Sequence, residues 1–381
     1  MAMLFIYETR GASRHHQKRI PSEKMKKPIL LGMLAYCVCG SASAQSSVTL
    51  YGSLDSGLAY VNNSGGHALF KANQSNMQPD RWGITGVEDL GGGLHTLFRL
   101  ENGFFTDTGA LVNTNSFFNR QAYVGLESDQ FGRVTLGHQS ALSFDLLTPF
   151  ANAYAGNSWN MFHPGNVDGL ANSATSSINN AVKYRSPTWS GLYVAALFGF
   201  GNTTDFQYGT TSSVALHYGN GPFEASVFYQ IQHNQAFSLS PLALGTFQHQ
   251  PAASYVADRA QFWGAGASYR LDAIKLHLLY TRVKLESKNF ADVYQSWDSG
   301  AEWSVTAAST LTAGANTTTL DTHRWTQVGL GYIYSLSKRT QLYLQGVYEH
   351  ANPGSLASLS IAGVSSTNNQ LLLLTGIHHN F

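Results

Sequence analysis

The carboxyl-terminal segment of this chain alternates between apolar and polar side chains up to its last residue. Across residues 371–381, one face of an extended chain would carry Leu371, Leu373, Thr375, Ile377, His379 and Phe381. Such a period of two is typical of a β-strand with one apolar and one polar face, although Leu374 breaks the pattern. A strand of this kind at an open edge invites aggregation, whereas a closed barrel in lipid needs it to pair with the first strand. We therefore expect a transmembrane barrel, with the last strand of a soluble β-sandwich as the alternative.

The amino-terminal segment has the layout of a secretory signal peptide. Residues 25–44 have a basic start, an apolar stretch too short to span a bilayer as a helix, and a small-residue exit, which predicts cleavage after Ala44. Residues 1–24 are basic and are interpreted as an upstream extension. A lipoprotein signal is the alternative, because Cys37 and Cys39 lie near the end of the apolar stretch.

Removal of this leader changes the composition of the chain. Of the 23 Lys and Arg residues, seven precede Gln45, and of the 22 Asp and Glu residues, two do, which leaves 16 basic and 20 acidic residues. Both cysteines also lie in the leader, so the remaining 337 of the 381 residues hold no disulfide. That part contains no run of 18 apolar residues, which excludes helical membrane spans. We expect one β-barrel domain over residues 45–381.

Turn signals divide this domain into alternating strands. Tight turns rich in Gly, Asp, Asn, Ser and Pro are predicted at 88–93, 128–132, 186–191, 219–222, 271–273 and 335–340, with a seventh near Ala307 and Ala308. Longer polar connections are predicted at 62–79, 107–116, 141–179, 201–211, 233–258 and 351–369. The pattern indicates 16 antiparallel strands, with short turns at one end of the barrel and long loops at the other.

Several segments in combination resemble the Gram-negative general porins of the betaproteobacterial type. They are 47–52, 81–93, 97–104, 120–126, 132–139 and 336–340, together with the terminal Phe381. The resemblance implies a 16-stranded, homotrimeric β-barrel in the bacterial outer membrane, with short periplasmic turns, long extracellular loops and a third loop folded into the pore. It also implies that Phe381 is a signal for the barrel-assembly machinery, and that the function is general diffusion of small hydrophilic solutes and ions.

Alternation assigns most charged strand residues to a water-filled lumen. In the segment 81–85, Trp82 and Ile84 would face lipid, which turns Arg81 inward. A charge on the lipid face near the midplane would cost roughly 2–4 kcal/mol. The same reasoning places these residues in the lumen: Arg99, Glu101, Lys183 and Arg185.

The connection at 141–179 is too long for an ordinary hairpin loop and matches the inward-folded loop of the family by position. Asp145 and Asp168 are its only carboxylates. Arg120 joins the basic wall through the resemblance, because parity alone groups it with apolar residues. We expect a constriction in which the basic side is Arg81, Arg120 and Lys183, facing an acidic side drawn from Glu101, Asp145 and Asp168.

Other features of the sequence bear on selectivity and on competing functions. His138 stands where the family commonly has arginine, and together with the acidic mature chain it argues against strong anion selectivity.

No nucleophile-elbow context, ligand-spaced metal motif or basic aromatic stripe is apparent. We therefore expect no enzymatic activity, no cofactor or metal, and no nucleic-acid partner. Outer-membrane lipid and lipopolysaccharide are expected surroundings, and a non-channel adhesin or outer-membrane enzyme is the alternative function.

Overall fold

The computed structural model describes residues 47–155, 158–171 and 176–381. Every described residue belongs to one compact unit, Ala44–Phe381. The predicted leader and its cleavage after Ala44 lie outside the described residues and stay predictions.

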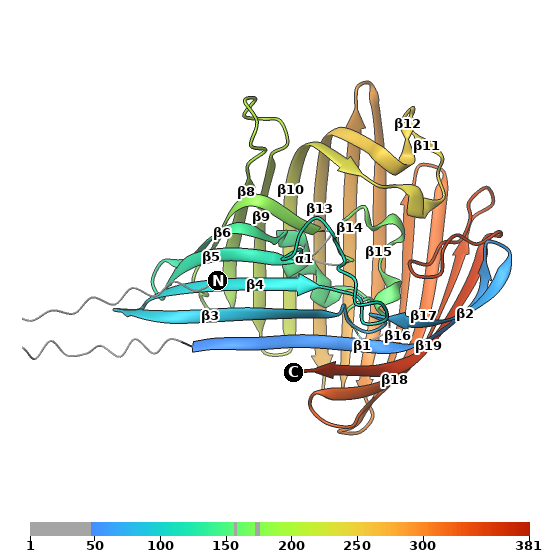
Figure 1. The fold of residues 1–381 in the computed structure, drawn as a ribbon, viewed down its shortest axis with the longest axis horizontal. Helices are drawn as coiled ribbons and strands as arrows, with labels where there is room; N and C mark the ends of the chain where they lie inside the picture. The colour runs from blue at the N-terminus through green and yellow to red at the C-terminus, as the bar shows by residue number, and fades with distance from the viewer. Residues whose placement is uncertain (1–46, 156–157, 172–175) are drawn as a thin grey trace, which may run out of the picture. The chain divides into compact units, whose positions relative to one another are not determined.

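Seventeen of the described strands form one antiparallel sheet that closes on itself (Figure 1). The first ten are β1 (Ser47–Ser64), β2 (His67–Gln74), β3 (Arg81–Gly91), β4 (Leu94–Gly103), β5 (Gln121–Ser128), β6 (Gly132–Ser140), β7 (Ser177–Arg185), β8 (Leu192–Gly199), β9 (Thr211–Asn220) and β10 (Phe223–Phe237). The others are β13 (Tyr255–Leu271), β14 (Ile274–Ser287), β15 (Phe290–Ser304), β16 (Ser309–Leu320), β17 (His323–Ser335), β18 (Thr340–Ala351) and β19 (Asn369–Asn380). A separate small hairpin joins β11 (Thr246–Phe247) to β12 (Gln250–Pro251).

The strands β2 and β3 share one place in the barrel, beside β1. The first half of β1 pairs with β3, with Ser53 opposite Arg81, and its second half pairs with β2, with Ser56 opposite Gln74. The described sheet therefore has 16 positions around the barrel, which confirms the predicted number. In the break between β2 and β3, the Asp55 carboxylate accepts a hydrogen bond of 2.7 Å from the backbone nitrogen of Met77.

The barrel closes where the first strand meets the last. β1 pairs antiparallel with β19, with Ser53 opposite Asn380. Beyond that ladder, the backbone nitrogen of Phe381 donates to the Gly52 carbonyl at 3.1 Å, and the Gly52 nitrogen donates to the Phe381 carbonyl at 3.2 Å. The predicted role of the terminal strand in removing both edges is confirmed, because β19 pairs with β18 on one side and with β1 on the other.

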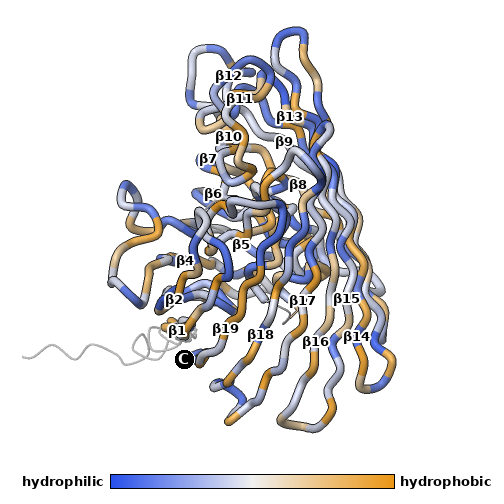
Figure 2. The backbone as a smooth tube through the Cα atoms, turned by 90° about the vertical axis from the view of Figure 1, so that its right-hand side faces the viewer, coloured by the Kyte–Doolittle hydropathy of each residue, from blue (hydrophilic) through white to orange (hydrophobic). Residues whose placement is uncertain are grey.

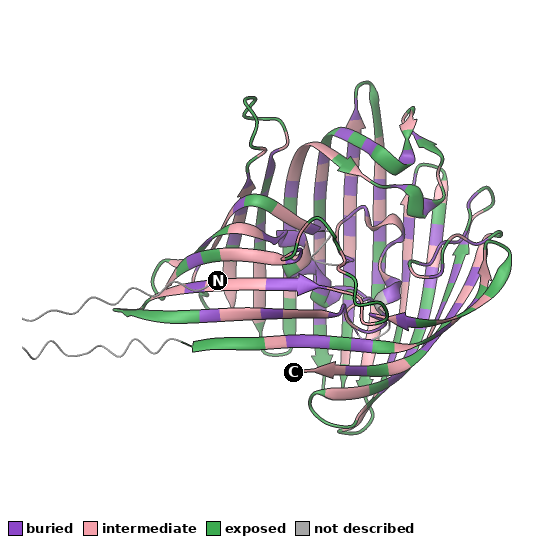
Figure 3. Cartoon of the chain, viewed as in Figure 1, coloured by how far each residue is buried: buried purple, intermediate pink, exposed green. Residues whose placement is uncertain are grey.

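The strands carry apolar side chains outward and mainly polar or shielded ones inward. Val48, Leu50 and Leu58 of β1 are 66%, 61% and 64% exposed, while the intervening Ser53 and Asp55 are buried. Figure 2 shows the same alternation of apolar and polar residues along β14 to β19, and Figure 3 shows it as alternating burial. An outer surface of this kind is stable against hydrocarbon rather than water.

All seven predicted tight turns occur, including the one between β15 and β16 near Ala307 and Ala308. Two long-loop predictions were wrong. Residues 62–79 hold the end of β1 and the hairpin strand β2, and residues 233–258 hold the ends of β10 and β13 with the β11–β12 hairpin between them. The strands extend into these polar segments because backbone pairing continues beyond the apolar belt that sequence hydropathy detects. No helix among the described residues is long and apolar enough to span a membrane.

The connection between β6 and β7, here called the third loop, folds into the barrel (Figure 1). It holds the short helix α1 (Leu142–Leu147) and the 3-10 turns η1 (Thr148–Phe150), η2 (Trp159–Met161) and η3 (Pro164–Asn166). Two further 3-10 turns, η4 (Ser240–Leu242) and η5 (Ala252–Ser254), follow β10. The largest hydrophobic cluster lies between the third loop and the wall, and it includes Leu142, Leu147 and Phe150. Apolar packing therefore holds this loop inside the barrel, as the resemblance implied.

Glycines on the inner wall make room for this packing. A side chain added at any of three of them would overlap the third loop, since an ideal Cβ would lie 2.1–2.6 Å from the nearest loop atom. The contacts are Leu147 on Gly264, Phe150 on Gly266 and Met161 on Gly329.

Candidate functional site

An ion pair lies on the inner wall where β4 and β5 meet. Arg120, which precedes β5, places its Nε atom 2.6 Å from Oε1 of Glu101 on β4, and both side chains are 5% exposed. Tyr51 on β1 donates a hydrogen bond of 2.7 Å to the other carboxylate oxygen of Glu101. Both oxygens of this carboxylate are thus engaged, which offsets the cost of burying its charge.

A second ion pair joins the wall to the third loop. Nζ of Lys183 on β7 lies 2.7 Å from Oδ2 of Asp145 in α1, and the side chains are 15% and 36% exposed. Ser140 at the end of β6 donates to Oδ1 of Asp145 at 2.5 Å. Because one partner belongs to the loop, this pair fixes the loop edge against the basic wall while staying in contact with water.

Three further arginines of the same wall have no carboxylate within ion-pair distance among the described residues. The Arg81 guanidinium donates to the carbonyl of Pro79 at 3.0 Å. Arg99 lies over the Tyr51 ring with its Cζ atom 5.6 Å from the centroid. Arg185 lies over the ring of Tyr193 at 4.2 Å. A backbone carbonyl stabilises Arg81, and aromatic faces stabilise Arg99 and Arg185, without neutralising them, so the wall keeps a local excess of positive charge.

Asp168 occupies a different place from the other predicted constriction residues. The residue is 4% exposed. Its carboxylate lies 2.6 Å from Nδ1 of His163 and accepts a hydrogen bond of 2.6 Å from the Thr281 hydroxyl on β14. Nε2 of His163 lies 3.4 Å from Asp298 on β15. This network attaches the third loop to the wall formed by β14 and β15.

The ionisation of His163 follows from these contacts. Burial alone lowers its pKa, but the carboxylates of Asp168 and Asp298 outweigh that effect and raise the pKa of His163 to about 10. The imidazole is therefore a cation at neutral pH, held between two anions. This pairing makes the attachment of the loop depend on charge.

The structure thus brings together Arg81, Arg120 and Glu101 at the junction of β3, β4 and β5, and it pairs Lys183 with Asp145 two strands further along the wall, on β7. The predicted geometry differs in one respect: Glu101 does not face Arg120 across the lumen. β4 and β5 are adjacent strands, with Glu101 opposite Gln121, so the two side chains pair directly on one wall. Sequence alternation reports which face a side chain takes, but it does not report which wall neighbours it.

Three residues of these networks, Tyr51, His163 and Asp298, were not predicted from the sequence. Tyr51 was recoverable, because it alternates with the exposed Leu50 and therefore faces the lumen. His163 and Asp298 carried no signal, since they meet only when the third loop folds inward. His138 contacts Asn179 at 2.6 Å and the backbone carbonyl of Asn119 at 3.2 Å, so it connects loop segments beside the wall.

A family model of Gram-negative porins matches residues 31–353, most of the chain. The chain belongs to the Gram-negative porin family. It is therefore an outer-membrane porin, and its closed barrel, inward loop and charged inner wall are the structural basis of a channel.

Relatives of this porin agree with the assignment. An outer membrane porin protein of Bordetella pertussis is 30% identical, with 85% of this chain and 94% of the relative covered. The structure of an anion-selective porin from Comamonas acidovorans superposes with a TM-score of 0.75 at 26% identity, with 88% of this chain and 100% of that chain covered. OmpT of Vibrio cholerae in its trimer form gives a TM-score of 0.64 at 15% identity, with 88% and 99% covered, a likeness of fold.

Proposed function

We propose that this porin is a passive diffusion channel whose constriction lies between the third loop and the inner face of β3 to β7, and that it passes small anions in moderate preference to cations. The observation that carries the proposal is the imbalance of charge on that wall. Glu101 and Asp145 are each paired with one base, whereas Arg81, Arg99 and Arg185 have no carboxylate partner among the described residues.

The effect of this charge imbalance on permeating ions depends on the dielectric surroundings of the wall. Charges that line a water-filled passage bounded by a low-dielectric barrel create a stronger field than the same charges on an open surface. The fixed arginines would raise the local concentration of anions, and the ion pairs would orient water across the passage. The acidic composition of the mature chain works against this preference, so we expect it to be moderate. The anion-selective relative supports the same sign.

We infer a homotrimer in the outer membrane, in contact with lipid and lipopolysaccharide, assembled by the barrel-assembly machinery through the strand that ends at Phe381. The inward loop and the charged wall favour a channel over an enzyme or an adhesin, because an anchor would need neither of them.

Reversal potentials in planar bilayers test the proposal. The variant carrying Arg81→Gln and Arg99→Gln should shift the reversal potential in a salt gradient toward cation preference. The interaction between a permeating ion and one arginine that is in contact with water is worth roughly 0.2–1 kcal/mol. This energy corresponds to about a 1.4- to 5-fold change in the permeability ratio for each arginine.

The matched control is Arg339→Gln, because Arg339 is exposed in the turn between β17 and β18, away from the constriction. Its reversal potential should equal that of the wild type. An unchanged reversal potential in the double variant would refute the role of the charged wall. Absence of stable ohmic steps in the wild type would refute the channel itself.

A further inference from the structure

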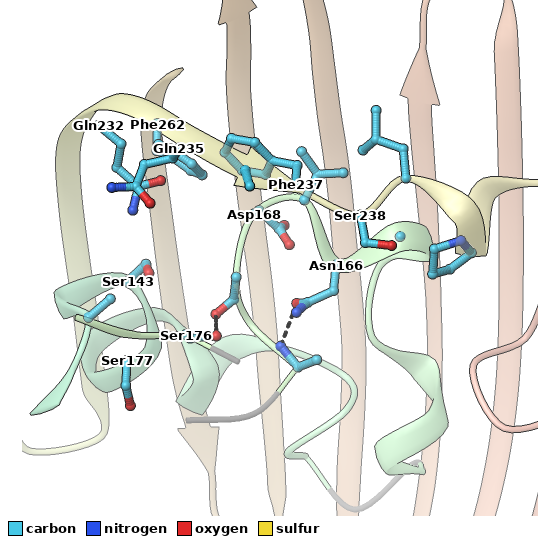
Figure 4. Close-up of a pocket in the computed structure, with 18 of the residues that line it drawn as sticks. Ser143, Asn166, Asp168, Ser176, Ser177, Gln232, Gln235, Phe237, Ser238 and Phe262 are labelled. Carbon is cyan, nitrogen blue, oxygen red and sulfur yellow. Dashed lines mark hydrogen bonds between the residues drawn. The ribbon is translucent and has the colours of Figure 1, made fainter. Parts of the chain in front are cut away.

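A cavity of about 970 Å³ opens on the long-loop side of the third loop (Figure 4). It lies among the third loop, the far end of β10, the connection after β8 and the connection between β18 and β19. Its volume is near the top of the range of small-molecule sites, roughly 300–1,000 Å³. The basic residues of the constriction do not line it, and none of its described lining residues is lysine or arginine.

One strand supplies a row of amides to this cavity. Gln230 and Gln232 of β10 both face the inside of the barrel and line the cavity. Asn234 follows with a left-handed φ of 52°. After this residue, Gln235 and Phe237 also line the cavity. The amide nitrogen of Gln235 donates to the Gly209 carbonyl at 3.1 Å. The Oε1 atoms of Gln232 and Gln235 accept no hydrogen bond from any described residue. Figure 4 shows these two side chains next to each other at the cavity wall.

Two buried oxygens at the cavity lack a hydrogen-bond donor within the described part of the chain. They are Oε1 of Gln230, a residue that is 3% exposed, and Oδ1 of Asp168, a residue that is 4% exposed. The second oxygen of Asp168 is already taken by His163 and Thr281. A buried acceptor without a partner costs free energy, and a ligand hydroxyl that donates to it recovers that cost.

Aromatic rings complete the lining. Phe237 lies at the cavity with Phe262 stacked against it, at a centroid distance of 6.2 Å and an interplanar angle of 28°. Asp168 and Ser238, labelled with Phe237 in Figure 4, line the same cavity. A flat apolar surface beside several acceptors and amides matches a molecule that has both C–H faces and many hydroxyl groups.

We propose that this cavity is a binding subsite for neutral, polyhydroxylated solutes of sugar size on their way to the constriction. Hydroxyl groups of the solute donate to Asp168, Gln230, Gln232 and Gln235, and its apolar face packs on Phe237. The inference rests on the proposed channel function and adds a substrate class to it. A cavity wall without lysine or arginine would not retain small anions, so the two solute classes are separated in space.

Current block by a neutral oligosaccharide tests the subsite. Maltotriose, added to the full-length protein in a planar bilayer, should reduce the ion current in a saturable manner. The Gln232→Ala, Gln235→Ala double variant and, separately, the Phe237→Ala variant are measured in the same way, with each block scaled to the variant's own open-channel current. In both, the half-blocking concentration should rise on the order of tenfold, which is about 1.4 kcal/mol of binding free energy.

The matched controls are Gln130→Ala, in the turn between β5 and β6, and Phe206→Ala, a ring that is 69% exposed outside the cavity. Both should leave the half-blocking concentration unchanged. Ohmic steps without any effect of maltotriose would overturn the subsite alone, whereas absence of ohmic steps would overturn the channel on which it rests. Equal block in wild type and cavity variants, or stronger block by succinate than by maltotriose at the same site, would also overturn it.

Discussion

At the scale of single residues, His163 decides how firmly the third loop is attached. Its pKa is raised to about 10 by Asp168 and Asp298, against an ordinary value of about 6.5 for histidine. A group whose pKa is higher in the folded state contributes stability that is complete below the unfolded pKa and is lost as the pH rises through the folded one. The part of the attachment that depends on this charge should therefore be largely present at pH 7 and be lost progressively as the pH rises to about 10.

Current noise and proteolysis of the third loop measure this dependence. In the wild type, both should increase as the pH is raised through about 10. In His163→Gln, which keeps a hydrogen-bond donor and lacks the charge, both should be elevated at pH 7 and should change little with pH. A wild-type channel that is equally quiet at neutral and strongly alkaline pH would contradict the prediction.

At the scale of elements, the third loop is placed by shape as well as by charge. Phe150 occupies the space above Gly266 on β13, where an added Cβ would lie 2.3 Å from the ring. The wall glycine thus sets how closely the loop approaches. Gly266→Leu should push the loop away, raise single-channel conductance and cost roughly 1–3 kcal/mol of stability through overpacking.

Conductance and thermal unfolding of Gly266→Leu, each compared with wild type, check this expectation. Gly346→Ala is the control, because Gly346 is on the outer face of β18, away from the loop, and an added Cβ there would meet only Leu373 at 3.3 Å. Unaltered conductance in folded Gly266→Leu would show that the loop is positioned without this contact.

At the scale of the whole molecule, stability depends on closing one seam. The Phe381 ring covers Gly52 of β1, and the two residues exchange backbone hydrogen bonds. Phe381→Ala should lower the folded fraction, measured as the form that resists denaturation without heating. The loss should be smaller than the roughly 3–5 kcal/mol of a buried phenylalanine, because Phe381 is 40% exposed.

Refolding of purified chains into detergent separates the seam from the proposed assembly signal. If Phe381 stabilises the seam, the variant is less stable in detergent, where no assembly machinery acts. A defect confined to cells would instead assign Phe381 to recognition alone. Phe206→Ala, in an exposed loop, is the control and should behave as wild type in both settings.

The amino-acid sequence by itself determined the barrel. The alternation of Leu50 and Tyr51, the apolar and polar faces of the last strand, and the turn residues at 88–93 act between near neighbours. They therefore specify strand number, turn positions and which side chains face water, without knowledge of the fold. The lengths of the strands beyond the lipid belt were underestimated, because polar residues such as those of β2 pair through their backbone regardless of hydropathy.

Only the tertiary structure decided which lumen residues touch. Glu101 pairs with Arg120 on one wall, Asp145 joins Lys183, and Asp168 turns away to His163. These contacts join strands and a loop whose relative placement depends on barrel closure and on the inner-wall glycines. The period-two pattern says only whether each side chain points inward or outward. The position of each side chain around the barrel, and how far the third loop reaches into the barrel, depend on the packing of the whole chain.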